Sequence, residues 1–532
     1  MILFNAIFKQ SLAERTAILY EQRQISYAEL RDQTLAIARG WRALGVDRGD
    51  RVALLLNDSP EFIAAFVSIC SYGAIAVPVN MGLRLEEQRA ILNNCTARVA
   101  IAEEDFCEAL LETESELNHL KQVVVVSRVE HKRGFTTSEP RTSSITRLFM
   151  ADLLSESPQQ PALEFPSPGQ NQPAFILYTS GSTGEPKGAV HRQSDIFYTN
   201  ETYCREVLRL REGDRLFSSS RLPFAYGLGN AFTFPLLNGC TTILCREKPA
   251  PDIIAKVFAD YKPTIFFGVP VVYRLLLDEA RKHSGDSTLD CSSLRLCISA
   301  GEALPAQLGE ECERFFGVPV LDGIGSTEML HMWMSNHEGE VVYGSSGKLL
   351  QGYEARLLDP EGNPTPSGAE GNLWVKGASG ALEYWERPKT TAHTFVDGWV
   401  RTGDLYRQAA DGNWFHMGRS DDCFKSSGQW VSPVEVEGVL LRHKGVSRVA
   451  VVEDFDDDHL PYACAFVVRS AVRLESGELE LSLRELARSA LPRFKQPRRY
   501  DFVDDLPYTA TGKVQRFKLR QQLRAPAAKT AK

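Results

Sequence analysis

The sequence Thr179-Ser-Gly-Ser-Thr-Gly-Glu-Pro-Lys-Gly188 directly follows a short apolar run, Ala174-Phe-Ile-Leu-Tyr178. Glycines let backbone N–H groups turn toward an anion, hydroxyl groups can donate to phosphate oxygens, and Lys187 adds a mobile positive charge. The loop is not of the Walker A type, because Pro186 precedes the lysine and Gly188 follows it. We expect it to bind phosphate through Thr179, Ser180, Gly181, Ser182, Thr183, Gly184 and Lys187. Read alone, the same string could also be an ordinary Gly/Ser turn.

Helical and strand patterns alternate along the chain before this loop. Apolar residues at helical spacing predict helices over 27–44, 60–70 and 85–92. Short apolar runs predict strands over 51–56, 74–79, 99–101 and 122–127. The alternation predicts an α/β fold with mostly parallel sheets flanked by helices. Residues 129–172 are rich in Ser, Thr, Pro and Gln, which predicts a surface connection with a helix near 145–154.

The composition is that of a globular enzyme with more than one domain. The chain has 532 residues and 43% hydrophobic content, and its net charge of −8 argues against a general affinity for nucleic acid. Its eleven cysteines form no Cys-x-x-Cys pair, which favours a reducing compartment and argues against structural zinc. Neither a signal peptide nor a membrane-spanning segment is indicated. We therefore expect a cytoplasmic protein without a membrane partner.

Five further segments carry chemically suggestive residues. They are Asp322-Gly-Ile-Gly-Ser-Thr-Glu328, Tyr384-Trp385, Trp399-Val-Arg-Thr-Gly-Asp404, Gly418-Arg-Ser-Asp-Asp-Cys-Phe-Lys425 and Pro507-Tyr-Thr-Ala-Thr-Gly-Lys513. Together with the loop at 179–188, these segments resemble the motifs of the adenylate-forming superfamily in their order and spacing. That superfamily contains acyl-CoA and aryl-CoA synthetases, luciferases and the adenylation domains of peptide synthetases.

The resemblance implies two domains and a tail. Residues 1–420 would form a large N-terminal domain with a small β-barrel-like part and the ATP and acid sites. Residues 421–523 would form a small mobile α+β domain that swings about a hinge at Asp421. A second α/β pattern beyond the Gly418–Asp422 segment independently favours a boundary there, with strands at 447–453 and 462–468 and a helix at 481–491. Residues 524–532 are expected to form a disordered tail.

The resemblance also assigns roles for ATP and Mg²⁺. Lys513 would bridge the acid and the α-phosphate, Thr327 would donate to the α-phosphate, and Glu328 would hold Mg²⁺. Asp404 and Arg419 would bind the ribose. The adenine and its surroundings would be framed by Gly301, Glu302, Ala303, Asp322, Gly323, Ile324, Gly325 and Ser326. Outside this resemblance, a lone aspartate in a turn more often bonds its own backbone.

The acid pocket resembles that of the bacterial benzoate–CoA ligases and their hydroxy- or aminobenzoate relatives. The segments Phe224-Ala-Tyr-Gly-Leu-Gly-Asn230 and Gly325-Ser-Thr-Glu-Met-Leu-His331 carry this likeness. The ring would be surrounded by Ala225, Tyr226, Gly227, Ala300, Gly301, Gly325, His331 and Met332. His331 could bond a ring substituent, although a buried histidine or tyrosine is more commonly a core residue.

Coenzyme A would accept the acyl group at Ser427, Gly428 and Trp430, where a glycine leaves room for the pantetheine arm. The sequence thus predicts an ATP-dependent aryl-carboxylate–CoA ligase for benzoate or a small ortho-substituted benzoate such as 2-aminobenzoate. We expect it to be a monomer or a homodimer. One alternative is an aryl-adenylating enzyme that loads a carrier protein. Another is a non-catalytic nucleotide-binding module, which we would expect to lack Lys513 or Glu328.

Overall fold

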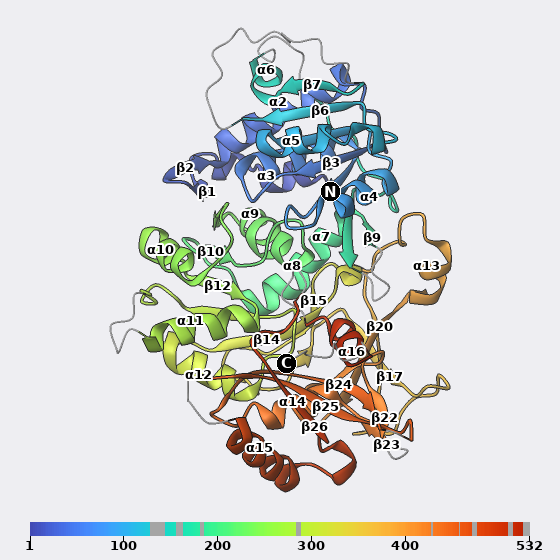
Figure 1. The fold of residues 1–532 in the computed structure, drawn as a ribbon. Coiled ribbons are helices and arrows are strands. Elements are labelled where there is room, and N and C mark those ends of the chain that lie inside the picture. Colours follow the sequence, from blue (N-terminus) through green and yellow to red (C-terminus); the bar gives the residue numbers. More distant parts are fainter. Residues whose placement is uncertain are drawn as a thin grey trace, which may run out of the picture.

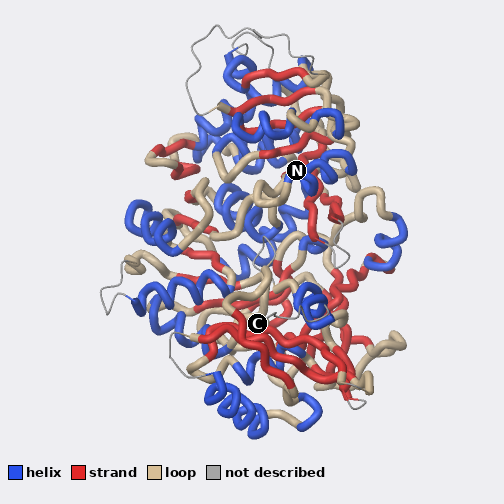
Figure 2. The backbone as a smooth tube through the Cα atoms, in the orientation of Figure 1, coloured by secondary structure: helices blue, strands red, loops and turns tan. Residues whose placement is uncertain are grey.

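The computed structural model of this chain (Figures 1 and 2) describes most of its length. The described residues are 1–127, 144–155, 163–180, 186–282, 289–426, 429–456, 458–470, 476–508 and 514–524.

A seven-stranded sheet in the blue and cyan part of Figure 1 forms the first layer. Its strands, in spatial order, are β7 (Thr146–Phe149), β6 (Gln122–Val126), β5 (Val99–Glu103), β3 (Arg51–Leu55), β4 (Ile75–Pro78), β8 (Phe175–Ser180) and β9 (Pro186–His191). Its strands pair in parallel except for the β8–β9 hairpin. The accompanying helices are α1 (Leu3–Ile7), η1 (Gln10–Leu12), α2 (Tyr27–Ala43), α3 (Pro60–Tyr72), α4 (Leu85–Asn94), α5 (Glu104–Leu111), η2 (Glu114–Glu116) and α6 (Met150–Ser155).

A nine-stranded sheet forms the second layer. Its order is β16 (Lys348–Leu349), β15 (Met332–Ser335), β14 (Val320–Gly325), β13 (Leu296–Ser299), β12 (Ile265–Gly268), β10 (Arg215–Ser218), β11 (Thr241–Ile243), β1 (Thr16–Tyr20) and β2 (Arg23–Ser26). The central strands from β14 to β1 are parallel, and the outer strands are antiparallel. The helices of this part are α7 (Gln193–Thr199), π-helical η3 (Asn200–Leu208), α8 (Ala225–Leu228), π-helical η4 (Gly229–Thr233), α9 (Phe234–Leu237), α10 (Pro251–Tyr261), α11 (Pro270–Lys282), α12 (Ala306–Phe316) and the short η5 (Thr327–Met329).

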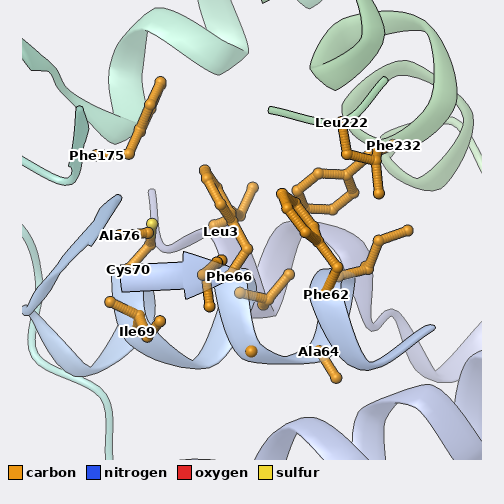
Figure 3. Packing of buried hydrophobic residues seen from close by; sticks show 14 of the residues in the cluster. Leu3, Phe62, Ala64, Phe66, Ile69, Cys70, Ala76, Phe175, Leu222 and Phe232 are labelled. Carbon is orange, nitrogen blue, oxygen red and sulfur yellow. The ribbon is translucent and has the colours of Figure 1, made fainter. Parts of the chain in front are cut away.

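Helix α3 packs between Phe175 and the segment that carries Leu222 and Phe232 (Figure 3). It is apolar on all sides, so it has no face suited to water and is buried along its length. Ser59 caps its first turn by accepting from the Phe62 N–H, and Pro60 occupies the first helical position. Phe66 packs against Phe175 of β8 and against Phe232 of η4, a helix of the second layer, with ring centres 5.4 Å apart in each pair. The helix therefore joins both sheets into one core.

A five-stranded antiparallel sheet follows in the sequence. It consists of β17 (Glu354–Leu358), β18 (Glu370–Lys376), β20 (Trp399–Gln408), β19 (Phe395–Val396) and β21 (Trp414–Arg419), and α13 (Pro388–Thr394) precedes β19. Its buried side chains pack with those of the nine-stranded sheet in one cluster that includes Trp333, Leu373 and Tyr406. This sheet corresponds to the small β part expected from the resemblance.

The last part of the chain, orange to red in Figure 1, has its own core. It contains β22 (Phe424–Ser426), β23 (Gln429–Val431), α14 (Pro433–Leu440), β24 (Val446–Phe455), β25 (Pro461–Arg469), α15 (Ser476–Ala490), η6 (Arg493–Lys495), β26 (Arg499–Val503) and α16 (Arg516–Arg524). Successive residues of β24 alternate between two clusters: Val449 and Val451 pack with α14 and α15, and Ala450 and Val452 pack with Leu519 of α16. Helices therefore cover both faces of this three-stranded sheet.

The predicted fold class is confirmed, with one local error. The expected helix near 145–154 is instead β7 followed by α6. The strand forms because Thr146 to Phe149 pair in parallel with β6 at the sheet edge, where neighbouring backbone groups are available. Arg524 still belongs to α16, and the rest of the expected tail lies outside the described residues. Within the described part, no helix has the length and hydropathy needed to cross a bilayer.

Candidate active site

Most predicted site residues of the nine-stranded sheet lie at one edge of it. Strands β10, β12, β13 and β14 are parallel, so their carboxyl ends meet at the same edge, which is where ligands bind in open α/β sheets. Residues Ala300, Gly301, Glu302 and Ala303 follow β13 directly. Asp322, Gly323, Ile324 and Gly325 belong to β14, and Ser326, Thr327 and Glu328 come immediately after it. Ala225, Tyr226 and Gly227 open α8, after the loop that leaves β10.

The expected adenine side contains a turn at a glycine and a buried aspartate. Gly301 has φ of +94°, a conformation that favours glycine. Asp322 is 3% exposed, and its Oδ2 accepts from the Leu304 N–H at 3.4 Å. Its Oδ1 has no hydrogen-bond partner among the described residues. Burial raises the pKa of Asp322 to about 8, although Ser299 and nearby backbone N–H groups oppose the shift. A buried acceptor of this kind is suited to an amino group of a bound base.

The expected phosphate side combines a lysine, a tyrosine and a carboxylate. Thr179 and Lys187 face each other across the β8–β9 hairpin, at the base of the loop. The Lys187 ammonium lies 5.8 Å from the centre of the Tyr384 ring, and the Tyr384 hydroxyl donates to Glu328 Oε1 at 2.6 Å. Lys187 and Glu328 therefore both contact Tyr384. Gly181, Ser182, Thr183 and Gly184 lie outside the described residues, as does the side chain of Ser180.

Glu328 fits the part expected of a Mg²⁺ ligand. Within the described ranges, no group of three or more His, Cys, Asp or Glu residues could hold a metal ion on its own. Mg²⁺ is commonly held by one or two carboxylates together with substrate phosphates. Glu328, with Lys187 expected to bind phosphate nearby, is consistent with that arrangement, in which the ion would neutralise phosphate charge.

The expected ribose site lies on the antiparallel sheet. Asp404 of β20 faces Arg419 of β21, and the Arg419 guanidinium donates to Asp404 Oδ1 at 3.1 Å. His416 Nε2 lies 3.5 Å from the same oxygen. Asp404 is 9% exposed, so its position is fixed by these neighbours. The pair predicted from the sequence is therefore assembled in the structure.

His331 and three other aromatic rings pack together in the region predicted for the acid. His331 lies 4.7 Å from Tyr203, 4.7 Å from Phe234 and 5.8 Å from Tyr226, measured between ring centres. The Tyr226 hydroxyl is 3.3 Å from the Gly268 carbonyl and 3.4 Å from the Ile298 carbonyl. Ala225, Ala300 and Met332 are buried in the same part of the sheet. Tyr226 and His331, both predicted to lie against the ring of the acid, are thus close to each other, and their contact with the acid stays a prediction.

His331 is buried without hydrogen bonds. It is 3% exposed, and neither ring nitrogen has a partner of normal geometry among the described residues. Burial lowers the pKa of His331 to about 3, although the nearby Tyr226 backbone partly opposes this, so the ring is neutral. The Tyr203 hydroxyl and both polar atoms of the Asn230 side chain are likewise buried and unpartnered in the described part of the chain. Such groups are uncommon in cores and point to a polar ligand.

Two of the predicted glycines have a local reason to be glycine. A Cβ on Gly325 would lie 2.7 Å from the carbonyl carbon and oxygen of His331. A Cβ on Gly227 would lie 2.0 Å from the Arg221 carbonyl oxygen. Both positions exclude side chains because the backbone passes close by. Room for a flat substrate is therefore not needed to explain either glycine.

The segment around the expected hinge is anchored on both sides of one residue. The Ser420 N–H and hydroxyl both donate to the Gly403 carbonyl, each at 2.9 Å. Asp422 accepts from Arg520 at 2.9 Å and lies 3.7 Å from Arg516, both in α16. Asp421 between them is exposed. Asp421 is therefore the residue between two neighbours, Ser420 and Asp422, whose side chains are bonded to different parts of the chain.

Several residues expected to take part in the two reaction steps lie outside the described part of the chain. Lys513 is one of them, but its flanks Tyr508 and Val514 pair with each other. Tyr508 is close enough to Glu302 for the acidic charge to raise the pKa of its hydroxyl, after the larger effect of burial. Ser427, Gly428 and the side chain of Trp430 also lie outside the described part of the chain. The backbone of β22 pairs with that of β23 on either side of residues 427 and 428.

Several residues were not assigned a role from the sequence. Tyr384 belongs to the Tyr384-Trp385 segment singled out in the sequence, and that segment was the sequence signal for a role near Glu328. Tyr203 had none, because it lies on a π-helix far from any motif. His191 and Asp195 follow the phosphate loop within a few residues, but their burial and mutual contact need coordinates.

Comparison with known proteins identifies the family. A sequence profile described as AMP-binding enzyme matches residues 7–385, and one described as AMP-binding enzyme C-terminal domain matches residues 435–513. The chain therefore belongs to the AMP-binding enzyme family. It is 39% identical to the benzoate–CoA ligase of Thauera aromatica over 483 residues, which covers 90% of this chain and 86% of that protein.

Solved structures give the same result. The anthranilate CoA ligase AuaEII in complex with anthranoyl-AMP is similar with a TM-score of 0.90 and 34% identity, covering 98% of this chain and 97% of that one. A benzoate CoA ligase from Burkholderia xenovorans LB400 has a TM-score of 0.85 and 35% identity, covering 98% of this chain and 100% of that one. The resemblance seen in the sequence motifs is confirmed.

Proposed function

We propose that this protein is an ATP-dependent aryl-carboxylate–CoA ligase that forms AMP. The observation that carries the proposal is that Tyr384 contacts both Lys187 and Glu328, while three further aromatic rings pack around His331. The first pair suits a nucleotide triphosphate, and the second suits a flat acid. Similarity to the benzoate–CoA ligase and the anthranilate CoA ligase supports the same assignment.

The reaction has two steps. A carboxylate oxygen of the acid attacks the α-phosphorus of ATP, the bond between the α- and β-phosphates breaks, and pyrophosphate leaves. The thiolate of coenzyme A then attacks the carbonyl carbon of the aryl-adenylate, and AMP leaves. Because two anions meet in the first step, positive charge must be placed where it lowers their repulsion. Lys187 and Lys513 would supply that charge, Thr327 would donate to the α-phosphate, and Mg²⁺ held by Glu328 would neutralise the remaining phosphates.

The substrate class is benzoate or a small ortho-substituted benzoate, and the buried polar atoms favour the substituted acids. Neutral His331 offers one donor and one acceptor, and the Tyr203 hydroxyl offers a second donor. An amino or hydroxyl group on the ring could satisfy them, whereas unsubstituted benzoate would leave them unpaired. Unpaired buried groups cost about 1–3 kcal/mol each, which is enough to set a preference.

Coenzyme A is the proposed acceptor, with a carrier-protein thiol as the alternative. The Gly428→Leu variant should retain pyrophosphate release but lose thioester formation, because a side chain there would block the pantetheine arm. Separate assays of the two half-reactions check this. Equal loss of both steps would contradict a role for this segment in the second step.

The experiment that tests the function is ATP-dependent pyrophosphate release with and without coenzyme A. The acids are benzoate, 2-aminobenzoate, 2-hydroxybenzoate, 4-hydroxybenzoate, cinnamate, acetate and octanoate. We expect release with a small aryl acid and a coenzyme A thioester as product. Adenylation without a thioester would favour the carrier-protein alternative, and activity only with acetate or octanoate would overturn the assignment.

A further inference from the structure

A second buried histidine lies beside the candidate phosphate site and has no assigned role. His191 ends β9, the strand that begins at the phosphate loop, and its side chain is fully buried. Its ring stacks on Phe175 of β8, with centres 5.3 Å apart and planes inclined by 17°. The packing fixes the plane of the ring and therefore the direction in which its two nitrogens point.

Both nitrogens of His191 have oxygen partners. Nε2 lies 2.8 Å from the carbonyl oxygen of Thr327, which can only accept, so Nε2 is the donor. Nδ1 lies 3.0 Å from Oδ2 of Asp195, a carboxylate that is itself fully buried. The contact with Thr327 spans 136 residues of sequence and ends on the residue immediately before Glu328.

Asp195 also holds a second link to the same segment. It accepts from the Arg192 Nε at 2.8 Å, and the Arg192 Nη2 donates to the Gly380 carbonyl at 2.7 Å. The next residue, Ala381, donates its N–H to the Glu328 carbonyl at 2.8 Å. One carboxylate thus orients both a histidine and an arginine, and these hold the backbone on the two sides of Glu328.

We propose that His191 and Arg192, oriented by Asp195, are positioning residues that hold the Thr327–Glu328 backbone in place for adenylation. The inference rests on the proposed function. Neither side chain is expected to touch ATP or the acid. Each acts through a carbonyl oxygen, and the result is that the Thr327 hydroxyl and the Glu328 carboxylate are fixed relative to Lys187 on the same hairpin as His191.

A positioning role differs from a purely structural one in which half-reaction it affects. Thr327 and Glu328 have their expected roles in adenylation, so loss of the link should slow that step and spare thioester formation. A general loss of stability would instead lower both steps together. Residues that orient a site residue in this way typically contribute roughly 10–100-fold to activity.

The test compares two amide substitutions at one position. In His191→Gln the side-chain amide reaches the place of Nε2 and keeps a donor for the Thr327 carbonyl, whereas in His191→Asn it reaches only the place of Nδ1. The assays are ATP–pyrophosphate exchange, using the acid that gives the wild-type enzyme its fastest pyrophosphate release, and thioester formation from supplied aryl-AMP and coenzyme A. Thermal unfolding is recorded for each variant.

We expect His191→Asn to lower kcat of the exchange by roughly 10–100-fold, with the KM for the acid unchanged and thioester formation within about twofold of wild type. His191→Gln should stay within about threefold of wild type. Equal rates for the two variants, or parallel loss of both half-reactions, would overturn the proposal. If the wild-type enzyme exchanges pyrophosphate with none of the acids, the proposed function fails and this inference fails with it.

Two further variants keep the test decisive if substitution of His191 prevents folding. Arg192→Met removes the side-chain bonds to Gly380, Ala378 and Asp195 while leaving the His191 side chain itself unchanged, and it should slow the exchange selectively by about tenfold; a wild-type rate would overturn the proposal. The control is Asp214→Asn. Asp214 is also a buried carboxylate, paired with Arg295 at 2.7 Å, but it precedes β10 at the opposite end of the strands. It should lower the unfolding temperature and leave both half-reactions unchanged.

Discussion

His191 and His331 are both buried, yet their ring nitrogens have opposite surroundings. His191 has an oxygen partner at each nitrogen, and His331 has none among the described residues. The first lies beside the expected phosphate site and the second within the aromatic group expected to hold the acid. The phosphate side is therefore preorganised by the protein itself, while the acid side has polar atoms without a partner among the described residues, which a ligand could satisfy.

This difference separates two kinds of substitution. Changes on the phosphate side should slow adenylation of every acid by the same factor. Changes on the acid side should alter the preference among acids while the best rate changes less. Kinetics with several acids can therefore decide on which side a residue acts.

The largest effect is expected from Lys513→Ala. This lysine would neutralise charge between the acid and the α-phosphate, and the loss of one such stabiliser costs roughly a hundredfold or more. Adenylation should fall by that factor for benzoate and 2-aminobenzoate alike, measured as pyrophosphate release. Near-normal release, or a loss confined to one acid, would contradict the role.

A smaller, equally uniform effect is expected from Tyr384→Phe. The lost hydroxyl donates to Glu328, and burial together with the Glu328 charge raises the pKa of Tyr384, which keeps it a donor. We expect adenylation to fall by about tenfold for every acid. The control is Tyr27→Phe, which removes a buried hydroxyl bonded to the Cys240 carbonyl at 2.8 Å, away from the site. A change in the preference among acids would show instead that Tyr384 acts on the acid side of the site.

On the acid side, His331→Phe should alter preference rather than rate. The substitution keeps an aromatic ring but removes the donor and the acceptor. We expect the ratio of kcat/KM for 2-aminobenzoate over benzoate to fall by about tenfold, the scale of one hydrogen bond in a buried site. An unchanged ratio would show that His331 does not contact the ring substituent.

The smallest effect at neutral pH concerns stability. The pKa of His331 is about 3 in the folded chain against an ordinary 6.5, so below pH 6.5 the unfolded chain binds a proton that the folded chain does not. The stability from this difference is complete above pH 6.5 and is lost as the pH falls toward 3, by at most about 1.4 kcal/mol per pH unit. Denaturation by urea between pH 7 and 4 should therefore show a shallower acid decline for His331→Phe than for wild type. Parallel declines would mean that His331 is not held neutral.

Much of the fold followed from local sequence patterns. Helices and strands before the phosphate loop were predicted because their apolar spacing matches their burial, as in α2 with its Ser26–Glu29 capping box. The strand β7 was misread because its apolar residues suit either structure, and only pairing with β6 decides between them. Local sequence patterns do not show which edge of a sheet has unpaired backbone groups that can bind another strand.

The candidate site was predictable where motifs carry it and not elsewhere. Glu328, Asp404 and Arg419 belong to recognisable segments, and the structure places Asp404 against Arg419 as expected. Tyr203 contacts His331 from a π-helix, and the His191 contact with Thr327 joins residues 136 positions apart. Such contacts depend on how the sheets and helices pack together, and the spacing of residues in the sequence does not predict that packing.

The two anchors beside Asp421 have a consequence for protein engineering. Asp422 is held by Arg516 and Arg520, which belong to the same C-terminal part of the chain, whereas Ser420 is held by Gly403 of the preceding sheet. Each side therefore has its own side-chain attachment, and across the junction the backbone N–H groups of Asp422 and Cys423 donate to the Arg419 carbonyl. If a C-terminal part is taken from a relative together with its final helix and joined at Asp421, it would keep the contacts between that helix and the position of Asp422. That position is the natural place to build chimeras that combine one enzyme's acid preference with another's acceptor.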